Sequence, residues 1–189
     1  MNRTATAPQP ETTPSRPRLF PREGSDLGKL TSDLAIRASF HARLKSGNRF
    51  VVAFYRLGLL PLLGAGRSIL LIITKGRVSA KPRFFPVGYH RIGGDLHVFS
   101  TWGKRSNWYK NLLANPDDVS VQVGFRRVPV RVEVLDDPAE ATRVLRRFIA
   151  ESPARARQLI GWDPNLDRVE TADFSRMLHS VMIARFLKR

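Results

Sequence analysis

The chain has 189 residues, no cysteine, and a formal charge of +16 from 32 Lys and Arg against 16 Asp and Glu. Without cysteine, disulfides, thiolate nucleophiles and cysteine-bound zinc or iron–sulfur centres are excluded. The positive charge favours an anionic partner, which can be a phosphorylated cofactor, a nucleic acid or an anionic membrane surface. With 42% hydrophobic residues, the chain can form the core of one ordinary domain.

Residues 1–28 are rich in Pro, Thr and Arg, and this composition predicts a disordered basic arm. The arm lacks the apolar centre of a signal peptide, so we expect a cytoplasmic protein. A single domain is expected at residues 29–189, of which residues 29–64 favour helices.

The stretch from residue 48 to residue 64 is mostly apolar, and Arg49 and Arg56 lie at its margins. Pro61 and the neighbouring glycines interrupt it, so it does not predict a spanning helix. Two interpretations stay open. The segment is either a helix packed across a sheet or an amphipathic segment that holds the protein peripherally on the inner face of the cell membrane.

From residue 68 to residue 135 the pattern becomes that of strands and predicts the core of a barrel. SILLIIT at 68–74 fits a strand buried on both faces, RFFPVGYH at 83–90 fits a second strand, and the turn at Gly93 leads into a third. A short helix beginning near Ser106 follows. Alternating residues around Gly124 predict a further hairpin.

The C-terminal part predicts two helices within 138–160 and a last strand near 181–187. Asp137 is the expected N-cap of the first helix, with Pro138 at its first position, and Gly161 is expected to end the second. Five or six mostly antiparallel strands with short inserted helices predict the α+β class and a small barrel.

The turn after the first predicted strand, TKGRVSAKPR at 74–83, places four cations around small residues. Backbone N–H groups of such a turn can converge on an anion, and an Arg side chain can bind a phosphate or carboxylate through two hydrogen bonds. The spacing fits neither a P-loop nor a dinucleotide fingerprint, so a solvated basic hairpin stays the alternative.

Side chains alone offer little catalytic chemistry. The four histidines have no metal-binding spacing, no metal site is predicted, and no serine lies in a nucleophile elbow. If the chain is an enzyme, we expect a bound cofactor to perform the chemistry. Trp102, Trp108 and Tyr109 lie among cations and are expected either to stack on a planar ring or to pack in the core.

Two motifs carry a family resemblance, namely LLIIT.GR.S..PR..P at 70–86 and WYKNLLANPDDVSVQVG at 108–124, with GWDP at 161–164 as a weaker third. In these motifs the chain resembles the nitroreductase family of deazaflavin-dependent oxidoreductases. The resemblance implies a split β-barrel and coenzyme F420 as cofactor. It further implies hydride transfer from reduced F420 to a small-molecule, electron-poor acceptor such as a quinone or nitro compound.

Other functions stay open beside this one. An FMN- or haem-binding split-barrel protein, or a non-catalytic cofactor carrier, would share the fold. A basic module for nucleic acid or anionic membrane would explain the charge of +16. A homodimer is open as well.

The resemblance also implies the site. The first turn and the start of the Trp-Tyr helix would hold the deazaflavin, its phosphate and its polyglutamate tail. For the hydride transfer, we expect Ser100, Thr101 or a backbone N–H to donate a hydrogen bond to the developing anion. Val78 stands where members of the family have Lys, so Lys75, Lys81, Lys104 or Arg105 is expected to supply part of the charge for the tail. The expected cofactor-binding residues are Lys75, Arg77, Ser79, Lys81, Arg83, Pro86, Trp102, Trp108, Tyr109 and Asn111.

Overall fold

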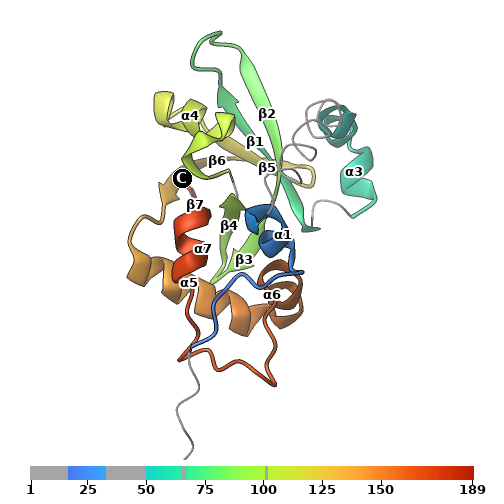
Figure 1. Ribbon diagram of the computed structural model, residues 1–189. Coiled ribbons are helices and arrows are strands. Elements are labelled where there is room, and N and C mark those ends of the chain that lie inside the picture. Colours follow the sequence, from blue (N-terminus) through green and yellow to red (C-terminus); the bar gives the residue numbers. More distant parts are fainter. Residues whose placement is uncertain (1–16, 33–49, 65–66, 101) are drawn as a thin grey trace, which may run out of the picture.

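The computed structural model describes residues 17–32, 50–64, 67–100 and 102–189. Seven antiparallel strands form one curled sheet in the order β2-β1-β5-β6-β7-β4-β3, with short helices around it (Figure 1). The strands are β1 (Ile69–Lys75), β2 (Pro82–Gly88), β3 (His90–Ile92), β4 (Asp95–Ser100), β5 (Ser120–Val123), β6 (Arg126–Val134) and β7 (Met182–Lys188). The predicted α+β split barrel is confirmed, with more strands than the five or six expected.

The additional strand comes from the run at 83–90, which is not one strand. β2 and β3 are consecutive in the chain but lie at opposite edges of the sheet. Tyr89 joins them, is buried, and donates its backbone N–H to the Ser68 carbonyl at 3.0 Å. The sheet therefore curls until its two edges are bridged by the chain itself, which leaves the barrel split.

The helices are α1 (Asp26–Ser32), α3 (Leu59–Leu62), η2 (Gly103–Arg105), α4 (Asn107–Ala114), α5 (Pro138–Glu151), α6 (Pro153–Ile160) and α7 (Ser175–Ser180). Residues 50–56 are helical as well. Asp137 caps α5 as predicted, because its carboxylate accepts the N–H groups of Ala139 and Glu140 at 3.0 and 3.2 Å. No helix within the described ranges is long and apolar enough to cross a membrane.

Three apolar clusters hold the fold together. In the first, Trp108 and Leu112 of α4 close one end of the barrel by packing with Leu70 and Val98 of the strands. The second lies between the sheet and helices α5 to α7, which gather on one side of it in Figure 1. The third covers the outer face of β1, where Tyr55 packs on Leu71.

The prediction that residues 1–28 form a disordered arm is wrong for residues 17–28, and residues 1–16 lie outside the described part. Phe20 is fully buried against Trp162 and Phe174, with ring centroids 5.6 and 5.4 Å apart. Leu27 of α1 is buried too. Composition averaged over the segment concealed these apolar anchors among its prolines and arginines.

Candidate cofactor-binding site

The turn between β1 and β2, residues 76–81, has a closed and strained conformation. Its ends are tied because the Gly76 N–H donates to the Lys81 carbonyl at 2.9 Å and the Ala80 N–H donates to the Gly76 carbonyl at 2.8 Å. Ala80 has φ 53°, a left-handed conformation that costs a residue with a Cβ about 1 kcal/mol. At Gly76 a Cβ would lie 2.8 Å from Ser79 Oγ, so a larger residue there would have to displace the Ser79 side chain.

The turn faces the first part of α4 across a hollow of about 300 Å³. Asn111 of α4 is buried, and its Oδ1 accepts both the backbone N–H and the Nη1 of Arg77 at 3.2 Å. Arg83 Nη2 donates to Ser79 Oγ at 3.1 Å. The hollow, named here the turn hollow, is lined by Gly76, Arg77, Val78, Ser79, Arg83, Phe85, Asn107 and Asn111.

The electrostatics of the turn hollow favour an anion. Two guanidinium groups and no carboxylate belong to its lining. Each guanidinium has five N–H donors in a planar fork, so the contacts to Asn111 and Ser79 leave donors available on Arg77 and Arg83. Phe85 adds an apolar wall. The hollow can therefore hold a phosphate or carboxylate next to an apolar group.

Four of the predicted residues line the turn hollow, namely Arg77, Ser79, Arg83 and Asn111. Two predicted aromatic residues do not. Trp108 and Tyr109 are 7% and 8% exposed and belong to the apolar interior of the barrel. Their rings are edge to face with each other at 6.3 Å, a geometry common in apolar cores. Their contact with a cofactor stays a prediction.

Three other predicted residues lie elsewhere on β1, β2 and the turn. Pro86 is paired with Leu71 and therefore points to the outer face of β2, opposite to Phe85. Lys75 lines a different hollow, where its Nζ is 3.8 Å from an Asp118 oxygen. Lys81 is exposed at the end of the turn.

The predicted hydrogen-bond donors lie at the end of β4. Ser100 is buried and paired with Met182 at the start of β7. Thr101 lies outside the described residues, and the half-buried Trp102 precedes η2. Neither Ser100 nor Trp102 lines the turn hollow. Their contact with a cofactor or acceptor stays a prediction.

The prediction missed two residues of the hollow. Phe85 lies two residues after Arg83 in the same strand and so shares its face. Asn107 lies four residues before Asn111 and so shares its side of α4. Strand and helix spacing could have found both. Within the described ranges, no group of three or more His, Asp or Glu side chains could hold a metal ion.

The fold and the hollow define a split-barrel protein with a positively charged hollow between the β1–β2 turn and α4. Residues 49–162 match the profile of the F420H2-dependent quinone reductase family, and the chain belongs to this family. It is accordingly an F420-dependent oxidoreductase, and its cofactor is coenzyme F420.

Several solved structures are similar to the chain. An F420-H2 dependent reductase, FDR-A, is 22% identical, with a TM-score of 0.41 over 65% of this chain and 95% of that chain. A conserved hypothetical protein from Mycobacterium tuberculosis is 16% identical, with a TM-score of 0.44 over 65% and 73%. An FAD-binding protein from Mesorhizobium loti is 19% identical, with a TM-score of 0.39 over 65% and 79%. No curated protein sequence matches the chain.

The residues of the turn hollow fit a cofactor with a phosphate and a carboxylate-bearing tail. Ser79 Oγ and Arg83 Nε both lie close to Gly76, so a hydroxyl and a guanidinium meet at one backbone position. A Cβ at Gly76 would fill the space between them. When bound, reduced F420 supplies a hydride. The cations of the turn hollow would bind the anionic groups of F420 and orient it.

Proposed function

We propose that the protein reduces a quinone or nitro compound, with F420 bound in the turn hollow by Arg77, Arg83, Ser79 and Asn111. One observation carries the assignment of the site. Asn111 fixes Arg77 from α4 while Ser79 fixes Arg83 from the turn, so both guanidinium groups are positioned on one hollow before any ligand binds. Preorganised cations of this kind bind anions more tightly than free side chains do.

We propose a supporting role for the end of β4. A hydroxyl of Ser100 or Thr101 would donate a hydrogen bond to the acceptor oxygen on which negative charge develops, and a donor fixed in place stabilises that charge best. Ser100 suits this role because it lies at the end of a strand that is paired with β7 along its length. Ser100→Ala should lower kcat and leave F420 affinity unchanged.

The function is tested by titrating the full-length protein with F420 and monitoring the fluorescence of F420. We expect saturation in the micromolar range, and no binding at about 50 μM would overturn the proposal. A parallel titration with FMN tests the alternative cofactor, and tighter FMN binding would favour it. Turnover with a soluble benzoquinone and with nitrobenzene, each with reduced F420, then distinguishes the two acceptors.

We also propose that the segment 50–63, which is helical at residues 50–56 and 59–62, places the enzyme on an anionic membrane surface. Leu57, Leu62 and Leu63 are 73%, 73% and 83% exposed, which is unusual for large apolar side chains so close together. The exposed ring of Phe125 extends this surface, because it packs on Gly58. Arg56 lies beside them with its guanidinium 4.8 Å from the Phe84 ring centroid. Exposed apolar side chains beside cations suit an interfacial helix.

Point substitutions test the membrane proposal better than deletion of the segment, because deletion would remove the buried Tyr55. Leu57→Glu with Leu63→Glu should reduce sedimentation with phosphatidylglycerol vesicles roughly tenfold. Leu166→Glu is the control, since Leu166 is also an exposed leucine but lies in the loop after α6. Equal binding of both variants to the vesicles would contradict the proposal.

A further inference from the structure

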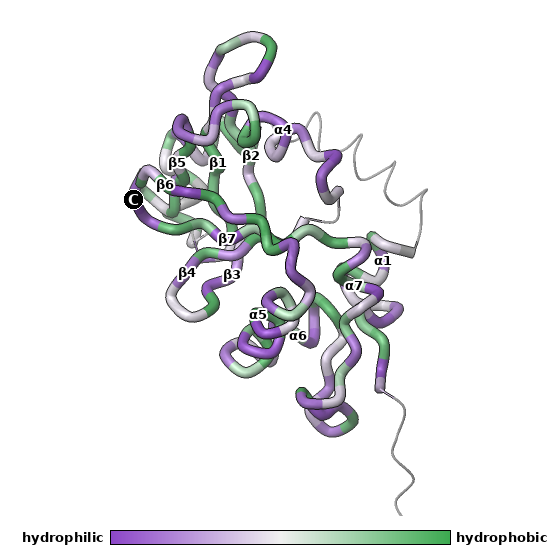
Figure 2. Tube along the Cα trace, turned by 90° about the vertical axis from the view of Figure 1, so that its left-hand side faces the viewer, coloured by the Kyte–Doolittle hydropathy of each residue, from purple (hydrophilic) through white to green (hydrophobic). Residues whose placement is uncertain are grey.

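The barrel has another hollow at the end that α4 does not close. It lies between the turn after β3 and the β5–β6 pair and has a volume of about 360 Å³. Figure 2 shows β5, β6, β4 and the C-terminus gathered on this side of the molecule. The hollow, named here the mouth hollow, shares no lining residue with the turn hollow.

The wall of the mouth hollow is apolar. Val121, Val130 and Phe186 are buried at its base, while Leu96, Val123 and Val128 are only half-buried along its sides. These side chains belong to the interior face of the sheet, because β5 and β6 place Val121 opposite Val128. The barrel interior is thus incompletely filled here, and its apolar surface is open to a ligand.

The rim of the mouth hollow is positive. Arg91, Arg126 and Lys188 are exposed around it, against the single carboxylate of Asp95. Among the residues that the structure describes, no ion pair joins any of these three cations to a carboxylate. The three cations come from different strands, so they converge on the opening only in the folded barrel.

We propose that the mouth hollow binds an anionic amphiphile, with an aliphatic chain against the valines and a carboxylate or similar head group on Arg91, Arg126 and Lys188. Burial of the chain supplies affinity in proportion to the apolar area removed from water. Side chains with hydrogen-bonding groups occur only at the rim, so a peptide or nucleotide inside would leave polar groups without partners. The volume corresponds to roughly a dozen water-sized groups, which is enough for a medium-length acyl chain.

The first experiment compares a charged and an uncharged chain. The full-length protein is titrated with dodecanoate below its micelle concentration and with dodecanol, each by displacement of a dansylated undecanoate probe. Dodecanoate should bind at least about tenfold more tightly, because its head group meets unpaired cations. Equal affinity of the acid and the alcohol would overturn the assignment of the rim.

Matched variants locate the site. Arg126→Glu at the rim should weaken dodecanoate binding roughly tenfold and leave dodecanol binding unchanged, while Arg157→Glu, the same change on an exposed residue of α6, should alter neither. Val128→Trp should weaken both ligands because it fills the hollow, provided that circular dichroism shows a folded protein. Equal effects of Arg126→Glu and Arg157→Glu on dodecanoate would overturn the proposal.

Two further measurements complete the test. One distinguishes the possible sources of such a ligand, and the other shows which of the two hollows it occupies. Displacement of the probe by dissolved dodecanoate supports a free fatty acid, and displacement only by phosphatidylglycerol vesicles supports an acyl chain of membrane lipid. Displacement by neither would overturn the site. Saturating dodecanoate should leave the F420 titration unchanged, and competition with F420 would place it in the turn hollow instead.

Discussion

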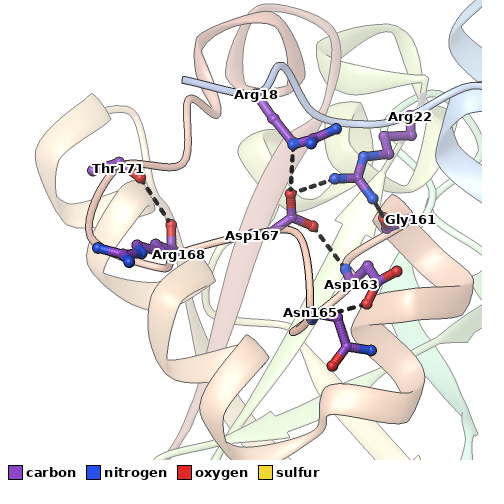
Figure 3. Close-up of polar contacts among 8 residues, drawn as sticks. All are labelled: Arg18, Arg22, Gly161, Asp163, Asn165, Asp167, Arg168 and Thr171. Carbon is purple, nitrogen blue, oxygen red and sulfur yellow. Dashed lines mark hydrogen bonds and ion pairs between the residues drawn. The ribbon is translucent and has the colours of Figure 1, made fainter. Parts of the chain in front are cut away.

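Arg22 and Asp167, 145 residues apart in the chain, form an ion pair that joins the N-terminal segment to the loop after α6 (Figure 3). The Asp167 side chain is 1% exposed, and its second oxygen accepts the Asp163 N–H at 2.7 Å. Arg22 Nη1 donates to the Gly161 carbonyl at 2.8 Å. One arginine therefore satisfies both a buried carboxylate and the C-terminal end of α6.

Removal of this arginine should destabilise the protein strongly. In Arg22→Ala the Asp167 carboxylate stays buried with the more distant Arg18, whose Nε is 3.6 Å away, as its one remaining cationic partner among the described residues. We expect the free energy of unfolding to fall by about 3 kcal/mol, measured by urea denaturation. Arg18 is half exposed, so Arg18→Ala is the control and should cost less than about 1 kcal/mol. Similar losses in the two variants would contradict this account of the pair.

Substitution in the turn hollow should weaken cofactor binding without unfolding the protein. Arg83→Ala removes a guanidinium that Ser79 positions, and we expect F420 affinity to fall by about tenfold to a hundredfold. Arg157→Ala on α6 is the control for the loss of one positive charge. If both variants bind F420 equally, the β1–β2 turn does not hold its anionic groups.

Loss of one hydroxyl should loosen the helical segment from the sheet. Tyr55 donates its hydroxyl to the Ile69 carbonyl and accepts the Gly124 N–H, both at 2.9 Å. Burial raises the pKa of Tyr55, so the hydroxyl stays a donor across the neutral range. Tyr55→Phe leaves two backbone groups without their partner and should lower the free energy of unfolding by about 2 kcal/mol. An unchanged urea midpoint would contradict the predicted cost.

Acid should destabilise the fold through His90. Burial, assisted by the positive charge of Arg155, lowers the pKa of His90 to about 4. In the unfolded chain the pKa is about 6.5, so between these values the unfolded state binds more protons than the folded state. The stabilising contribution of neutral His90 to the free energy of unfolding is complete above about pH 6.5. It is lost as pH falls toward about 4, and the loss amounts to up to about 3 kcal/mol.

The variant His90→Phe tests this assignment. The ring lies between Phe99 and Phe148, with centroids 5.3 and 4.7 Å away, so a phenyl ring has suitable neighbours. The difference in urea midpoint between about pH 7.5 and about pH 5 should shrink in the variant. It should not vanish, because burial lowers the pKa of His97 as well. A difference as large as in the unsubstituted protein would assign the pH dependence to other groups.

Local patterns predicted those parts of the fold that depend on local chemistry. Asp137 caps α5, and Gly161 ends α6 in the left-handed conformation, because these residue types satisfy helix ends wherever the helix lies. The sequence did not predict that the chain divides into two strands at Tyr89, because this division does not depend on local chemistry. A run of apolar residues shows that strands form, but the edge of the sheet that each strand joins depends on how the whole sheet curls.

The site residues divide in the same way, into those that local chemistry predicts and those whose position depends on the whole fold. Charge and turn chemistry predicted Arg77, Ser79 and Arg83, and the helical motif predicted Asn111. Trp108 and Tyr109 lie in the barrel interior, which the sequence left open because the direction of a helix face depends on the docking of α4 over the barrel. Their contact with the cofactor stays a prediction. The strained Ala80 had no signal in the sequence, because the left-handed conformation is usual for glycine rather than alanine.

The contacts of Phe20 and Arg22 determine when this protein can reach its native fold during synthesis. Their partners, from Gly161 to Phe174, leave the ribosome about 145 residues later. At roughly 5–20 residues per second this interval is on the order of ten seconds or more. Throughout it, the apolar Phe20 lacks its aromatic partners Trp162 and Phe174. Translation speed along the last third of the gene should therefore influence how much of the protein folds correctly.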